Sequence, residues 1–108
     1  MMQTIEQQRA NFCLKKIQKD KKFKTNAQRL VSFIVSNGLL PTLAFYKKDE
    51  KKPVYELLNS WLKEKHYINN DALKELAEAD ANKLLIVTSE AIAFSNWLKK
   101  VVEIEIKD

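Results

Sequence analysis

The sequence from residue 84 to residue 101 is LLIVTSEAIAFSNWLKKV, and this stretch decides the fold. Its apolar residues recur at alternating intervals of three and four, the spacing of one stripe along an α-helix. The stripe consists of Leu84, Val87, Ala91, Phe94, Leu98 and Val101. Ile92 and Trp97 widen it, so we expect a long C-terminal helix that packs against several others. Residues 102–106 alternate like a strand but would lack a partner, so we interpret them as a helix end or a frayed tail.

The same helical spacing is found immediately upstream. The clearest of these helices begins at Pro53, because a first helical turn tolerates a residue without an N–H. Its apolar face comprises Val54, Leu57, Leu58, Trp61 and Leu62. After a connector at residues 67–70, Asn70 or Asp71 can cap a brief helix that extends to about Ala77.

Three further helices are predicted in the N-terminal half. The first covers residues 4–22, and we interpret the lysine cluster at residues 19–24 as its end, because cations suit the negative end of a helix dipole. Its apolar stripe contains Ala10, Cys13, Leu14 and Ile17. Asn26 is predicted to cap a second helix, which stops at Gly38 because glycine adopts the left-handed conformation without a Cβ penalty. A short third helix is predicted from Leu39 to about residue 48.

The composition agrees with a helical protein. A chain of 108 residues is long enough for one domain, which we place at residues 1–108, and too short for two. One glycine and two prolines supply too little turn chemistry for a many-stranded sheet, and they exclude glycine-rich phosphate-binding loops. We therefore predict an all-α fold: a compact single-domain bundle of about five to seven helices with a long C-terminal helix.

Neither a membrane segment nor a disulfide framework is expected. The longest apolar run, residues 84–87, is far too short to span a bilayer, and no apolar stretch of signal-peptide type lies near the start. A single cysteine cannot form an internal disulfide. These features favour a cytoplasmic location and no membrane partner.

The sequence contains no catalytic constellation, and we predict no enzyme activity, no metal site and no cofactor. The only histidine, His66, follows a predicted helix, where a surface histidine near the negative dipole end is ordinary. Cys13 lies on an apolar stripe, so a buried structural thiol is expected rather than a nucleophile. Acidic residues are scattered and suggest no two-metal site.

The charge is distributed unequally along the chain. Residues 1–52 contain 12 Lys/Arg and 4 Asp/Glu, a net +8, whereas residues 53–108 contain 7 Lys/Arg and 10 Asp/Glu, a net −3. A basic half joined to an acidic half suggests one face for a polyanion and another for protein, although a solvated surface explains the same composition.

Nucleic-acid binding is the functional hypothesis that this asymmetry favours. Lysines contact phosphates as point charges, which gives salt-dependent affinity without sequence readout. The residues that we predict to contact an RNA backbone are Arg9, Lys15, Lys16, Lys19, Lys47 and Lys48; Lys22, Lys24, Arg29, Lys51 and Lys52 are weaker candidates. The aromatic residues fall in apolar helical patterns, so core packing rather than base stacking is expected of Phe12, Phe33, Phe45, Trp61, Phe94 and Trp97.

Several stretches together resemble the small subunit of the Cmr complex, the type III-B CRISPR effector. The opening pair Arg9-Ala10 resembles the start of that family's first helix. The most specific match is Asn37-Gly38-Leu39 followed by Thr42-Leu43-Ala44-Phe45 and lysines at 47 and 48. Tyr55, Leu58, Trp61 and Leu62 are similar to the next helix, and Thr88, Glu90-Ala91 and Trp97-Leu98-Lys99 to the closing one.

The resemblance implies a compact all-α subunit with no catalytic activity of its own. It also implies that guide RNA and target RNA, other Cmr subunits and copies of the same chain in a head-to-tail stack are its partners. Two different surfaces of opposite charge would suit such a stack. The alternative is a small basic helical DNA-binding regulator, although no helix carries a cluster of Asn, Gln and Arg that would read bases.

Overall fold

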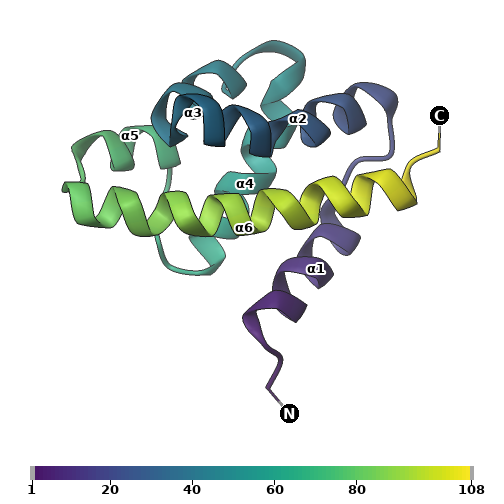
Figure 1. The fold of residues 1–108 in the computed structure, drawn as a ribbon, viewed down its shortest axis with the longest axis horizontal. Helices are drawn as coiled ribbons and strands as arrows, with labels where there is room; N and C mark the ends of the chain where they lie inside the picture. Colours follow the sequence, from purple (N-terminus) through teal and green to yellow (C-terminus); the bar gives the residue numbers. More distant parts are fainter. Residues whose placement is uncertain (1, 108) are drawn as a thin grey trace.

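Residues 2–107 are described in a computed structural model (Figure 1). Their elements are α1 (Ile5–Lys16), α2 (Lys21–Asn37), α3 (Leu39–Tyr46), the 3₁₀ turn η1 (Asp49–Lys51), α4 (Lys52–Glu64), α5 (Ala72–Glu78) and α6 (Ala81–Glu105). The radius of gyration is 13.1 Å, close to the value of about 13 Å expected for a folded chain of this length. The predicted all-α fold with a long last helix is confirmed.

Helix α6 is the longest helix of the described residues, and α1, α2 and α4 pack against it. Figure 1 shows it running across the whole width, with α2 alongside it on one side and α1 at an oblique angle to it on the other. Five of the six residues of the predicted apolar stripe are buried, and Leu84 is half-buried. The helix continues to Glu105 and the buried Ile106 follows it, so residues 102–106 are a helix end and not a frayed tail.

The junction of α1 and α2 differs from the prediction. Helix α1 ends at Lys16, and the side chain of Asp20 accepts a hydrogen bond of 2.8 Å from the backbone N–H of Phe23, which caps α2. Asn26, the predicted cap, lies inside α2. A carboxylate satisfies the free N–H groups and the positive dipole end of a new helix, so the lysines of residues 21–24 occupy its first turn.

Gly38 ends α2 and begins α3, as its position predicted. Its φ is +89° and its ψ is 164°, so the residue is not in the left-handed helical conformation that we expected but in a region restricted to glycine. A Cβ there would meet only the Pro41 Cδ at 3.8 Å. Conformation, not space, therefore requires glycine at this turn.

The core is centred on an aromatic cluster between α1, α4 and α6. The Phe12 ring packs edge-on against Trp61 and Phe94 with centroid distances of 5.3 and 5.9 Å, and the Trp61 and Phe94 rings are stacked at 5.2 Å. Cys13 is fully buried, which raises the pKa of its thiol to about 12, as expected of a structural thiol. The prediction of core packing is wrong for Phe45, a residue that is 43% exposed.

Candidate nucleic-acid interface

The six residues that we predicted to contact RNA separate into two groups in the structure. Arg9 and Lys47 are partly buried and form ion pairs with carboxylates of the same chain. The other four are exposed: Lys15, Lys16, Lys19 and Lys48. The same prediction therefore selected cations in two different environments.

Arg9 joins α1 to α6. Its Nε and Nη2 donate to the two carboxylate oxygens of Glu90 at 2.8 and 2.7 Å, and the Trp61 Nε1 donates to the same carboxylate at 3.0 Å. Burial opposes ionisation of Glu90, but the hydrogen bonds from Arg9 and Trp61 hold its pKa below the ordinary value. Because a buried charge needs its partner, Arg9 has a structural role here.

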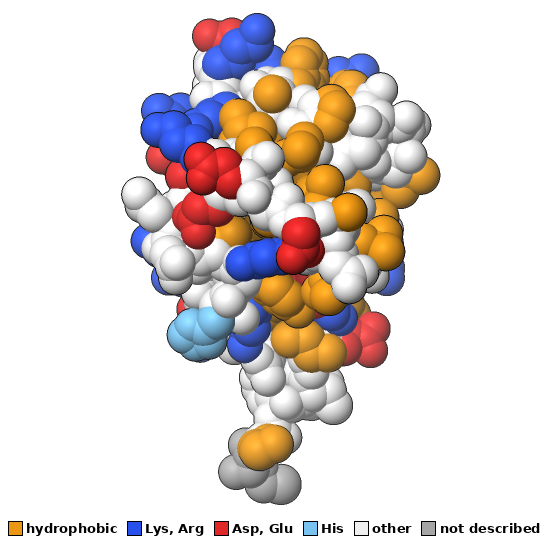
Figure 2. Space-filling view, turned by 90° about the vertical axis from the view of Figure 1, so that its left-hand side faces the viewer, with side chains coloured by type: hydrophobic (Ala, Val, Ile, Leu, Met, Phe, Trp, Pro, Cys, Tyr) orange, Lys and Arg blue, Asp and Glu red, His pale blue; other side chains and the backbone are white. Residues whose placement is uncertain are grey.

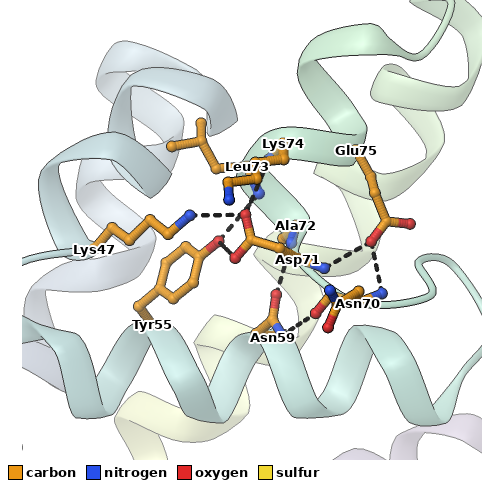
Figure 3. A network of polar contacts seen from close by, with 9 residues as sticks. All are labelled: Lys47, Tyr55, Asn59, Asn70, Asp71, Ala72, Leu73, Lys74 and Glu75. Atoms are coloured by element: carbon orange, nitrogen blue, oxygen red, sulfur yellow. Dashed lines mark hydrogen bonds and ion pairs between the residues drawn. The ribbon is translucent and has the colours of Figure 1, made fainter.

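Lys47 belongs to a polar network at the start of α5 (Figure 3). Its Nζ lies 2.8 Å from the Asp71 Oδ2, while the Tyr55 hydroxyl donates to the Asp71 Oδ1 at 2.8 Å and accepts from the Leu73 N–H at 3.1 Å. The Asp71 side chain also accepts from the Lys74 N–H, which caps α5 as predicted. Burial opposes ionisation of Asp71, but the hydrogen bonds from Lys47, Tyr55 and the Lys74 backbone hold its pKa low.

Two further side chains complete this network. Asn59 accepts from the Ala72 N–H at 2.7 Å and donates to the Asn70 carbonyl at 2.9 Å. The Glu75 carboxylate accepts from three successive backbone N–H groups, those of residues 69–71, and the bond from Asn69 is the main cause of its lowered pKa. The network fixes the α4–α5 connection and offers no free nucleophile.

The fold brings together two lysine-rich segments that are far apart in sequence, residues 19–24 and 47–52. The Lys22 Nζ lies 2.8 Å from the Glu50 carboxylate, and the Asn26 side chain donates to the Glu50 carbonyl at 3.4 Å. The buried Tyr46 donates its hydroxyl proton to the Asn26 carbonyl at 2.7 Å. The Tyr46 bond joins α3 to α2, and η1 packs beside the start of α2, so both segments lie at one end of the molecule.

The lysines at the end of α1 lie next to these segments. A hollow of about 300 Å³ lies between α1, α2 and α4. Its lining includes Lys16 of α1, Phe23 of α2 and Pro53 of α4. Glu56 and Glu64 line its α4 side. We name the exposed lysines around this end the basic rim: Lys15, Lys16, Lys19, Lys21, Lys48 and Lys52.

Lys21 is a rim residue that the sequence interpretation did not single out. It was overlooked because the segment was taken as the end of one helix, whereas it is the first residue of α2. The signal that identifies it is Asp20, a capping residue three positions before the apolar Phe23. Of the rim lysines, Lys19 approaches a carboxylate, that of Glu105, at 3.8 Å. That pair is exposed and weak.

The face formed by α3, α5 and the start of α6 differs from the rim. Figure 2 shows lysine and arginine side chains there interspersed with aspartate and glutamate, with a band of hydrophobic side chains between them. Such a mixed surface lacks the excess of one charge that phosphate binding needs.

Within residues 2–107, no three His, Cys, Asp or Glu side chains are grouped so that they could hold a metal ion. No helix of this described range combines the length and the apolarity that crossing a bilayer requires. His66 is exposed and lies just beyond the end of α4 with a φ of +64°.

The helical unit corresponds to a known family. The family model described as CRISPR-associated protein (Cas_Cmr5) matches residues 5–105, from the first residue of α1 to the last residue of α6. The chain belongs to this family. It is therefore a small subunit of the Cmr CRISPR complex, which associates with other Cmr subunits. This membership favours the Cmr hypothesis over the DNA-binding regulator.

Proposed function

We propose that this chain is a non-catalytic Cmr subunit that contacts the phosphate backbone of the guide or target RNA through the basic rim and acts in the cytoplasm. The observation that supports the proposal most is the joining of residues 19–24 to residues 47–52 by the Lys22–Glu50 ion pair and the Tyr46–Asn26 hydrogen bond. Lysines from distant parts of the sequence thereby face one ligand.

The chemistry of the rim suits a backbone rather than base edges. All six rim residues are lysines. Their ammonium groups bind phosphates as point charges and lack the planar fork of N–H donors with which an arginine side chain contacts a guanine edge. We therefore expect affinity that does not depend on RNA sequence. Arg9 and Lys47 are paired with Glu90 and Asp71 inside the fold, so we leave them out of the contacting set.

The proposal includes stacking with copies of the chain and with other Cmr subunits. A head-to-tail contact joins two different surfaces, and complementary groups on them favour the correct orientation. The mixed face of α3, α5 and the start of α6 supplies one of these surfaces, and the basic rim is left to the RNA. The N-terminal half of α6 adds two exposed apolar side chains, Leu85 and Ile86.

A lack of catalysis is consistent with the environment of the reactive side chains. The Cys13 thiol is buried with a pKa of about 12, so it remains protonated and unreactive at neutral pH. Asp71, Glu75 and Glu90 use their carboxylates to accept hydrogen bonds from the fold itself. Pure chain incubated with labelled RNA should leave the RNA intact, and cleavage that co-purifies with the chain would contradict this part.

The RNA contact is tested in the assembled Cmr complex. The test variant carries Gln at Lys15, Lys16, Lys21 and Lys48, and a control with the same change of charge carries Gln at Lys63, Lys74, Lys83 and Lys99, four exposed lysines outside the rim. Both variants should still assemble with guide RNA and the larger Cmr subunits, as shown by co-elution in size-exclusion chromatography. Target-RNA binding should weaken only in the rim variant. Equal binding by both variants would contradict the proposed interface.

A further inference from the structure

The exposed aromatic ring of Phe45 is a feature that neither the core nor the basic rim explains. Phe45 lies at the end of α3, and its ring centroid is 5.2 Å from that of Phe33 on α2, with the two planes inclined by 49°. Phe33 itself is half-buried against the core. The two rings therefore form a continuous aromatic surface that is fixed on the inside and open to solvent on the outside.

A hollow continues this surface along α2. It has a volume of about 340 Å³ and is lined by Gln28, Arg29, Ser32, Phe33, Ser36 and Asn37. Phe33 gives it an apolar wall, and the hydroxyl and amide groups supply hydrogen-bond donors and acceptors. None of the six lining residues is acidic, and one carboxylate adjoins them: Glu103 accepts a hydrogen bond of 3.1 Å from the Gln28 side chain.

Cations lie close to both rings. The Lys51 Nζ lies over the Phe45 ring, 4.5 Å from its centroid, so it covers one face of that ring. Arg29 is exposed and lines the hollow beside Phe33. Phe45 is also followed, after Tyr46, by the lysine-rich residues 47–52, so the aromatic surface adjoins the proposed phosphate contacts. Proteins that bind single-stranded nucleic acids use aromatic rings flanked by cations: the bases stack on the rings, and the phosphates lie near the charges.

We propose that Phe45 and Phe33 receive an unstacked base of single-stranded RNA, which takes the place of the Lys51 ammonium on the Phe45 ring, while Lys51 and Arg29 bind the flanking phosphates. The inference rests on the proposed RNA contact and extends it to an unpaired nucleotide. The bases of a duplex are covered by their neighbours, so a duplex reaches only the basic rim. An apolar protein segment fits less well, because such a segment gains nothing from the two cations.

The test compares a single-stranded RNA containing 2-aminopurine with a duplex of the same length. Phe45→Ala should weaken single-strand binding by about fivefold or more, the effect of losing one stacking contact, and should abolish the quenching of 2-aminopurine fluorescence. Phe45→Leu keeps the apolar volume and should behave like Phe45→Ala, whereas Phe45→Trp should retain both affinity and quenching. Duplex binding should be the same in all four proteins.

A second variant leaves the ring packing untouched. Ser32→Glu places a negative charge in the hollow on an exposed position of α2, and it should weaken single-strand binding without changing the thermal unfolding midpoint. This variant keeps the test decisive if Phe45→Ala is unstable.

The outcomes separate this inference from the function on which it rests. If the wild type binds neither RNA form, the RNA contact itself is wrong. If it binds both, but Phe45→Ala and Ser32→Glu bind the single strand and quench like the wild type, only the stacking site is wrong. A Phe45→Ala defect confined to assembly with other Cmr subunits, with RNA affinity unchanged, would assign this surface to protein and overturn the inference.

Discussion

The Arg9–Glu90 and Lys22–Glu50 ion pairs have nearly the same length, 2.7 and 2.8 Å, and opposite surroundings. The side chains of the first pair are 16% and 6% exposed, whereas those of the second are 71% and 63% exposed. Both cations come from the basic half of the sequence. The difference shows that burial, not distance or charge, decides whether a lysine or arginine supports the fold or remains available to a ligand.

The largest effect on stability is expected from Glu90→Gln. The change leaves the Arg9 charge in a partly buried site without its counter-ion, and it should lower the free energy of unfolding by about 3 kcal/mol. Urea denaturation at neutral pH measures this. Glu103→Gln, at an exposed position of the same helix, is the matched control and should be near neutral. Equal unfolding midpoints for the two variants would contradict the structural role of Arg9.

A smaller loss is expected from Asp71→Ala. The variant removes the α5 cap and the acceptor of Lys47 and Tyr55, so it should destabilise the chain by about 2 kcal/mol. Asp80→Ala serves as the control. The Asp80 side chain caps α6 by accepting from the Lys83 N–H and, unlike Asp71, is not part of a side-chain network of the described residues. That variant should lose only the cap, about 1 kcal/mol. Equal stability of the two variants would show that the network of Figure 3 adds nothing to stability beyond the helix cap.

The pH dependence of stability sharpens the same contrast. The pKa values of Glu90 and Asp71 are lower in the folded chain than in the unfolded one, so their contribution is complete above the unfolded values near pH 4. It is lost as the pH falls through the folded values. The double variant Glu90→Gln, Asp71→Asn should therefore lose less stability between pH 7 and pH 3 than the wild type. Parallel losses, measured by urea denaturation at both pH values, would show that these groups do not carry the linkage.

The smallest effect is expected from Lys22→Gln. This change breaks the exposed pair with Glu50, where water screens the charges, and the unfolding midpoint should not change measurably. Thermal unfolding followed by circular dichroism is sufficient to test it. A loss comparable to that of Glu90→Gln would show that distance outweighs burial after all.

Periodicity was enough to predict most of the fold. The apolar spacing identified α4 and α6, and Pro53, Gly38 and Asp71 marked helix boundaries that the structure confirms. The α1–α2 boundary was missed because several lysines suggested a helix end, whereas one carboxylate, that of Asp20, starts a new helix. At this boundary the Asp20 cap determines the structure more strongly than the surrounding lysines do.

The site was less predictable because it depends on tertiary contacts. Nothing near Arg9 in sequence indicates that Glu90 lies opposite it, and Lys47 meets Asp71 only because α3 and α5 pack together. One clue was present: Glu90 lies within the apolar stretch of α6, where a charged residue must be paired. The exposure of Phe45 similarly depends on how α3 packs, which its apolar pattern does not reveal.

The central claim is that the exposed rim lysines bind phosphates and the internal cations do not. The most direct measurement is the slope of log Kobs against log salt concentration for RNA binding by the chain. Replacing Lys15, Lys16, Lys21 and Lys48 by Gln should reduce the slope by about 3 units on single-stranded RNA, whereas Lys47→Gln should leave it unchanged while the chain remains folded. An unchanged slope in the rim variant, or a reduction by Lys47→Gln as large as that from one rim lysine, would contradict the account.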